Sequence, residues 1–128
     1  MIDRGWMTPH FRVHEMACPC GKCGALANMQ LEFMERLEDM RVNHYGYPMM
    51  INSAFRCDYY APLIGVGVGD EHNTGWAADI RVTSDAQRYL LLEGARKAGF
   101  PRIGLGKTFM HVGCGPQYPS PRLWTYYP

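Results

Sequence analysis

Apolar residues recur at intervals of three and four between residues 25 and 45, which is the period of an amphipathic helix. The residues on this face are Leu26, Met29, Phe33, Leu37 and Met40. Glu32 and Arg36 are four residues apart and are expected to pair on the solvent side. Gly46 and Pro48 end the pattern. The sequence therefore predicts a helix over residues 25–45.

A second helix is predicted from Ser84 to about Ala98. The run Ser84-Asp85-Ala86-Gln87 resembles a capping box, in which the first hydroxyl accepts a hydrogen bond from a backbone N–H three residues later. Leu91 and Ala95 are expected on its buried face together with Ala98, and Gly99 follows its end.

Short apolar runs between turn residues predict strands. These runs are residues 49–53, 76–82, 103–105 and 109–112, and the last two are joined by a tight turn at Gly106-Lys107. Together with the two helices they predict an α+β domain, in which a small antiparallel sheet carries two main helices on one side.

The remaining segments are expected to be irregular parts of a single domain that spans residues 1–128. Residues 1–24 contain prolines and glycines, and residues 117–128 form a tail rich in Pro and Tyr. Residues 57–75 form a long loop with several glycines. Long ordered loops are often functional, so this one is predicted to border an active site.

Charge and hydropathy exclude some functional classes. The formal net charge is +1, which gives no electrostatic reason to expect binding of nucleic acid. No apolar run is long enough to span a bilayer, so membrane insertion is not expected. The first residues lack the apolar segment of a signal peptide, so synthesis in the cytoplasm without a leader is expected.

Three of the five cysteines lie close together at Cys18, Cys20 and Cys23. They could supply part of a structural zinc site, with His10 or His14 as the fourth ligand. The usual second pair of a zinc ribbon is missing downstream, so the sequence favours a turn that carries reduced thiols without metal over a second zinc ion.

Two histidines and an aspartate form a candidate catalytic metal site. His72 and Asp79 are seven positions apart around Gly75, and His111 lies in the predicted strand 109–112. Two His and one Asp leave the fourth position of a tetrahedral zinc open, as in catalytic sites. Asp79 lies among apolar residues, where a carboxylate requires a proton donor or a metal.

Three blocks in this order resemble a known family: Ser53-Ala54-Phe55-Arg56, His72 with Asp79, and Phe109-Met110-His111-Val112. The sequence is similar to the zinc D-Ala-D-Ala carboxypeptidases and L-alanyl-D-glutamate endopeptidases, and above all to their short, phage-associated branch. The resemblance covers roughly residues 10–113. It includes an aromatic residue, a glutamate and a cysteine-containing turn at Phe11, Glu15 and Cys18.

The resemblance implies a role for each matched residue. His72, Asp79 and His111 correspond to the zinc ligands of the family. Arg56 corresponds to the arginine that holds the carboxylate or carbonyl of the substrate, for which a planar guanidinium is suited. Ser53 corresponds to a polar residue that helps to bind the substrate. A surface salt bridge is the alternative for Arg56.

The sequence departs from the family at the general base. Classical members carry an acid three positions before the last histidine, where this chain has Thr108. Members of the short branch often carry Asp two positions after it, where this chain has Gly113. Glu71, adjacent to His72, is the nearest substitute and is the predicted acid–base residue. Arg56, which orients the substrate, is the other predicted catalytic residue.

The predicted function is a zinc peptidase that hydrolyses stem or cross-link peptides of bacterial peptidoglycan, acting as a monomer. The lack of a leader suggests a phage endolysin released through a holin, or a virion component. Loss of both expected acids motivates an alternative, a catalytically silent zinc-binding domain of the same fold that is part of a virion or binds the cell wall. A third hypothesis is a redox or zinc-knuckle interaction module built on residues 18–23.

Overall fold

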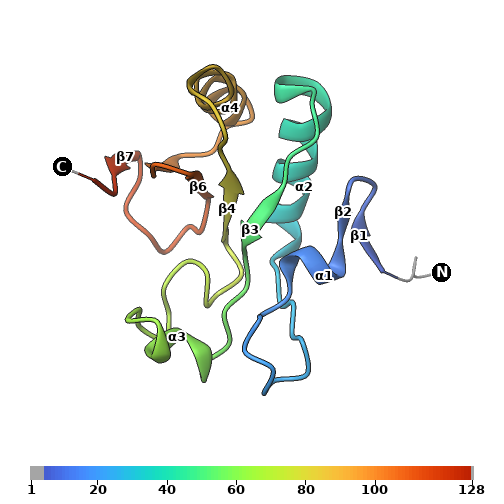
Figure 1. Ribbon diagram of the computed structural model, residues 1–128, viewed down its shortest axis with the longest axis vertical. Helices are drawn as coiled ribbons and strands as arrows, with labels where there is room; N and C mark the ends of the chain where they lie inside the picture. Colours follow the sequence, from blue (N-terminus) through green and yellow to red (C-terminus); the bar gives the residue numbers. More distant parts are fainter. Residues whose placement is uncertain (1–4, 128) are drawn as a thin grey trace.

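A five-stranded sheet forms the centre of the computed structural model, which describes residues 5–127 (Figure 1). The strand order is β3-β4-β6-β5-β7. The strands are β3 (Ile51–Ser53), β4 (Ala77–Arg81), β5 (Arg102–Leu105), β6 (Phe109–Gly113) and β7 (Arg122–Thr125). Neighbouring strands are antiparallel except β5 and β7, which are parallel. The predicted α+β class is confirmed, and β7 adds a parallel edge that was not predicted.

The first long helix begins later than predicted. Helix α2 (Leu31–Asp39) continues directly into the π-helical η1 (Met40–Tyr45), whereas residues 25–30 are not helical. Ala25 has a positive φ of 58°, which does not occur inside a right-handed helix. The N–H of Gln30 donates to the carbonyl of Gly75 at 3.0 Å, so the start of α2 is set by a contact with the loop before β4.

The second long helix confirms its prediction. Helix α4 (Asp85–Lys97) has Ser84 as its N-cap, and Ser84 Oγ accepts a hydrogen bond from the N–H of Gln87 at 3.0 Å. The side chain of Gln87 in turn accepts from the N–H of Thr83 at 2.7 Å. Among residues 5–127, no helix has the length and apolar character needed to cross a membrane.

Side chains along β4 and β6 alternate between the two faces of the sheet. Ile80, Met110 and Val112 are fully buried against apolar residues of the helices. These helical residues are Phe33, Leu37, Met40, Leu91 and Ala95. Asp79 and His111 fall between the buried positions, so their side chains point to the opposite face. The helices thus cover one face of the sheet, and the polar residues lie on the other.

Three segments predicted to be irregular, residues 1–24, 57–75 and 117–128, contain regular structure. The described part of residues 1–24 forms β1 (Trp6–Thr8), β2 (Phe11–Arg12) and the short helix α1 (Val13–Met16), while residues 1–4 lie outside the described residues. The tail contains β7, so the irregular prediction is wrong there. The loop that carries the short helix α3 (Tyr60–Leu63) lies at the opposite end of the molecule from α4 (Figure 1).

Gly75 permits the close approach between the loop before β4 and the segment before α2. Its φ is +80°, and a Cβ atom at this position would lie 2.1 Å from the carbonyl oxygen of Asn28. Any other residue would combine an unfavourable backbone conformation with a clash against backbone. Because His72 lies three residues earlier, this contact also holds the loop that carries it.

We predict that Gly75→Ala lowers the free energy of unfolding by about 2 kcal/mol or more, through backbone strain and displacement of Asn28. Urea denaturation measures the change. Gly67→Ala is the matched control, because Gly67 lies in the same loop with open space around it and no positive φ. Equal effects of the two substitutions would contradict this role of Gly75.

Candidate metal centre

Strand pairing brings two of the predicted ligands together. Asp79 of β4 is the direct cross-strand partner of His111 of β6. His72 lies at the end of the loop before β4, where the carbonyl of the adjacent Glu71 accepts from the N–H of Trp76 at 2.9 Å. The ligating atoms of the three residues all lie within 4.8 Å of one another. The structure therefore assembles the ligand set that the sequence predicts.

Both histidine rings are oriented by hydrogen bonds on their outer nitrogens. His72 Nδ1 lies 2.7 Å from the carbonyl oxygen of Ala54, which can only accept, so Nδ1 carries the hydrogen. His111 Nε2 lies 2.8 Å from Glu71 Oε1, a carboxylate oxygen that likewise accepts. In the neutral rings, the lone pairs of His72 Nε2 and His111 Nδ1 therefore point toward Asp79.

The three inner atoms have the spacing of zinc ligands. His72 Nε2, His111 Nδ1 and Asp79 Oδ1 are separated from one another by 3.2 Å. Tetrahedral bonds of about 2.0–2.1 Å to one zinc would place such atoms about 3.3 Å apart. Three electron-rich atoms converge here without a hydrogen of their own, so the donor set fits a zinc ion.

Electrostatics at the site favour a cation. Burial opposes ionisation of Asp79, but hydrogen bonds with His111 and His72 outweigh it and hold the pKa of Asp79 below its ordinary range. Burial also opposes protonation of His111, yet hydrogen bonds with Asp79 and Glu71 raise its pKa. A proton and a metal ion therefore compete for the same position, and zinc loading is expected to fall as the pH falls.

Arg56 and Ser53 border the metal ligands, as predicted. Arg56 Nη2 lies 3.4 Å from Asp79 Oδ2, and Arg56 Nε donates to Ser53 Oγ at 3.3 Å. The side chains of Arg56 and Asp79 are 14% and 13% exposed, against 4% for His72 and 5% for His111. The site is therefore most accessible beside Asp79 and Arg56. Arg56 does form a salt bridge, but with the candidate ligand Asp79 and in a largely buried position.

Glu71 is not one of the candidate ligands. It contacts the outer nitrogen of His111, on the side of the ring that faces away from Asp79 and His72. Besides His111, its carboxylate pairs with Arg102, whose Nε lies 2.9 Å from Oε2, and it is 5% exposed. Burial raises the pKa of Glu71, but the contacts with His111 and Arg102 outweigh this and lower it. These contacts suit a residue that orients His111, so the catalytic role of Glu71 stays a prediction.

The carboxylate of Glu71 also occupies the space beside Gly113. A Cβ atom on Gly113 would lie 2.1 Å from Glu71 Oε2. Position 113 is where the short branch often carries an aspartate. In this chain, the carboxylate that reaches this place comes from the loop before β4 instead of from β6.

Two further residues near the site were not predicted. Trp124 of β7 lies with its ring centroid 5.2 Å from that of His111, over Gly104, where a Cβ atom would clash with the indole at 2.6 Å. The guanidinium carbon Cζ of Arg102 lies 5.0 Å from the centroid of the same Trp124 ring. The alternation of Trp124 and Tyr126 with smaller residues could have indicated β7. No sequence signal distinguishes Arg102.

We predict that Glu71→Gln weakens zinc binding by about 10–100-fold, because a metal-bound histidine depends on the acceptor of its second nitrogen. Competition with a chromophoric chelator measures the affinity. Glu93→Gln on the exposed side of α4 is the matched control, and its affinity should equal that of the wild type.

Gly113→Asp gives a complementary test, because the added side chain clashes with Glu71. The double variant Glu71→Ala with Gly113→Asp should bind zinc more tightly than Glu71→Ala alone. If both variants bind equally, position 113 cannot supply the acceptor for His111.

Comparison with known proteins identifies the family. No curated protein matches the chain. A family model described as peptidase M15 matches residues 9–114, a range that contains all three residues of the candidate metal centre. The match spans most of the chain, and the observed donor set is consistent with the zinc dependence of this family. The chain therefore belongs to the peptidase M15 family of zinc metallopeptidases.

Proposed function

We propose that this protein hydrolyses a peptide bond in the stem or cross-link peptides of bacterial peptidoglycan. The observation that carries the proposal is the triangle of His72 Nε2, His111 Nδ1 and Asp79 Oδ1, each 3.2 Å from the others. The family match supports the metallopeptidase class, and the resemblance of the three sequence blocks supports peptidoglycan as the substrate.

The ligand residues define where the chemistry takes place. When bound, zinc supplies Lewis acidity that activates water near neutral pH and polarises a substrate carbonyl. Ala54 and Glu71 hold the two imidazoles in the required orientation. Asp79 is the most exposed of the ligands, so a substrate approaches along its side of the site.

Arg56 is the proposed substrate-binding residue. Its hydrogen bonds to Asp79 and Ser53 are 3.4 and 3.3 Å long, which makes them weak for a guanidinium. Arg56 can therefore exchange them for a carboxylate of the substrate, to which its planar fork binds with two parallel hydrogen bonds. Ser53 is proposed to position the guanidinium and the bound peptide.

An active peptidase differs from a catalytically silent relative in having a residue that can transfer a proton during the reaction. A peptidase needs a group that accepts a proton from water and delivers it to the leaving amine. Glu71 is the proposed group, but its carboxylate contacts the outer nitrogen of His111 and the guanidinium of Arg102. This geometry favours, as the second candidate, a zinc domain that binds muropeptides without cleaving them.

The biological setting is part of the same proposal and is supported by the sequence resemblance alone. A monomer made in the cytoplasm would reach the cell wall after holin-type release during phage lysis, or as a component of the virion. Its partners would be peptidoglycan peptides.

We predict that wild-type protein loaded with zinc releases soluble fragments from purified peptidoglycan, and that His72→Ala abolishes release with loss of zinc from this site. Mass spectrometry of the products identifies the bond, because a carboxypeptidase liberates D-alanine and an endopeptidase separates longer peptides. His44→Ala is the control, since His44 pairs with Asp39 away from the site.

Zinc-loaded wild type that binds muropeptides yet releases nothing at any pH would refute the peptidase and support the silent domain. Activity that survives in His72→Ala would place the reaction at a different site.

We predict that Arg56→Lys lowers kcat/KM by about 10–100-fold, the cost of losing a charged hydrogen bond in the substrate complex. Zinc content should stay at the wild-type value, because Arg56 is not a ligand. Steady-state kinetics on a muropeptide, paired with metal analysis, test this. Full activity of Arg56→Lys would show that the planar guanidinium is not needed.

A further inference from the structure

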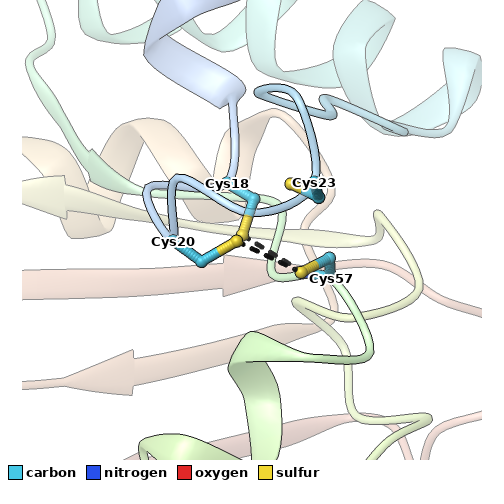
Figure 2. A group of neighbouring side chains, drawn as sticks. All are labelled: Cys18, Cys20, Cys23 and Cys57. Carbon is cyan, nitrogen blue, oxygen red and sulfur yellow. Dashed lines mark hydrogen bonds between the residues drawn. The ribbon is translucent and has the colours of Figure 1, made fainter.

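Four thiols gather at a second place (Figure 2). They lie on the turn after α1 and on the segment between β3 and α3, at the opposite end of the molecule from α4 (Figure 1). Cys18, Cys20 and Cys23 belong to the turn after α1. Cys57 follows β3 and lies 34 positions after Cys23 in the sequence. Their sulfur atoms all lie within 4.8 Å of one another. His10, one of the two histidines that the sequence suggested as a fourth ligand, instead contacts Glu38.

The sulfur spacing fits a shared metal ion. Sγ of Cys20 and Sγ of Cys57 are 3.6 Å apart. Four sulfurs at about 2.3 Å from one tetrahedral zinc would be separated by about 3.8 Å. A disulfide requires about 2.05 Å, and all five cysteines are free. The distance therefore fits two ligands of one ion, and it equally fits a contact between two thiols.

The backbone around the thiols has the form of a metal-binding turn. Cys20 and Cys23 have the two-residue spacing common to zinc ligands, and Gly21 and Gly24, which follow them, have φ values of +75° and +72°. The N–H of Lys22 points at Cys20 Sγ at 3.3 Å. The N–H of Cys57 points at Cys18 Sγ at 3.4 Å. Such N–H groups stabilise thiolate charge around a metal.

The chain around the thiols has no regular secondary structure. Residues 17–30 contain no helix or strand, which is long for an ordered connection in a small domain. Cys18 packs with Phe55 and Cys57 in a small cluster separate from the main core under the helices, whereas Ala27 and Met29 of the same segment pack against the main core. A structural metal is one means of ordering such a segment.

We propose that Cys18, Cys20, Cys23 and Cys57 bind one structural zinc ion, in addition to the zinc of the M15 site. Four cysteine ligands leave no open position, so this ion has no part in hydrolysis. It joins the turn after α1 to the segment after β3.

The proposed site lies next to the substrate-binding residue. Arg56 immediately precedes Cys57, and its carbonyl accepts a hydrogen bond from Asn73 Nδ2 at 2.8 Å. The N–H of Arg56 donates to the carbonyl of His72 at 3.3 Å. The structural zinc thereby fixes the backbone from which Arg56 reaches Asp79.

Metal analysis of the purified, zinc-loaded chain tests the proposal. We expect two zinc ions per chain in the wild type, one in His72→Ala, one in Cys23→Ser and none in the double variant. Cys23 is the chosen ligand because it is partly exposed, so a serine disturbs the packing little. Cys114→Ala is the matched control, since this fifth cysteine lies outside the cluster, and it should retain two ions.

Cobalt loading of folded His72→Ala supplies a measurement that needs no cysteine variant. A tetrahedral site of four thiolates gives the intense sulfur-to-cobalt charge-transfer absorption that oxygen and nitrogen ligands lack. The proposal is overturned if His72→Ala binds no metal, if the metal in the chain as purified is iron, or if mass spectrometry of peptides from the unreduced chain shows a disulfide between Cys20 and Cys57.

Discussion

The structure depends on the convergence of two imidazole lone pairs and one carboxylate on a single point. Such an arrangement is repulsive unless a cation occupies it, and the protein maintains it by fixing both rings from behind. Ala54 and Glu71 provide these outer contacts, one through a backbone carbonyl and the other through a carboxylate. Because the outer acceptors determine the tautomers, the affinity of the centre depends on them as well as on the ligands.

The sheet and the loop before β4 supply this geometry in different ways. Pairing of β4 with β6 places Asp79 opposite His111, and the alternation of side chains keeps both away from the apolar core. His72 instead depends on a loop without strands, which Gly75 holds against the start of α2. The regular part of the centre is thus secured by hydrogen-bonded pairing, and the irregular part by close contact between backbones.

Predictions from the sequence succeed where the signal is local. The capping residues of α4 and the apolar runs of the strands determine those elements by nearby contacts, and the three ligands stand out by residue type and order. The start of α2 could not be predicted, because Gly75 and Gln30 are distant in sequence. The same holds for Cys57, which joins the other thiols only in the folded chain, and for Trp124, whose position depends on parallel pairing with β5.

The contacts made by the segment from Ser53 to Cys57 limit where residues can be inserted into or deleted from this chain. Within five consecutive residues, Ala54 orients His72, Arg56 reaches Asp79, and Cys57 contacts Cys18. The N–H of Phe55 also donates to the carbonyl of Met16. Inserting or deleting one residue would shift each of these groups onto the wrong partner. Relatives should therefore keep this segment at constant length, while the loop from Asp58 to Asp70 can lengthen or shorten at small cost in chain entropy.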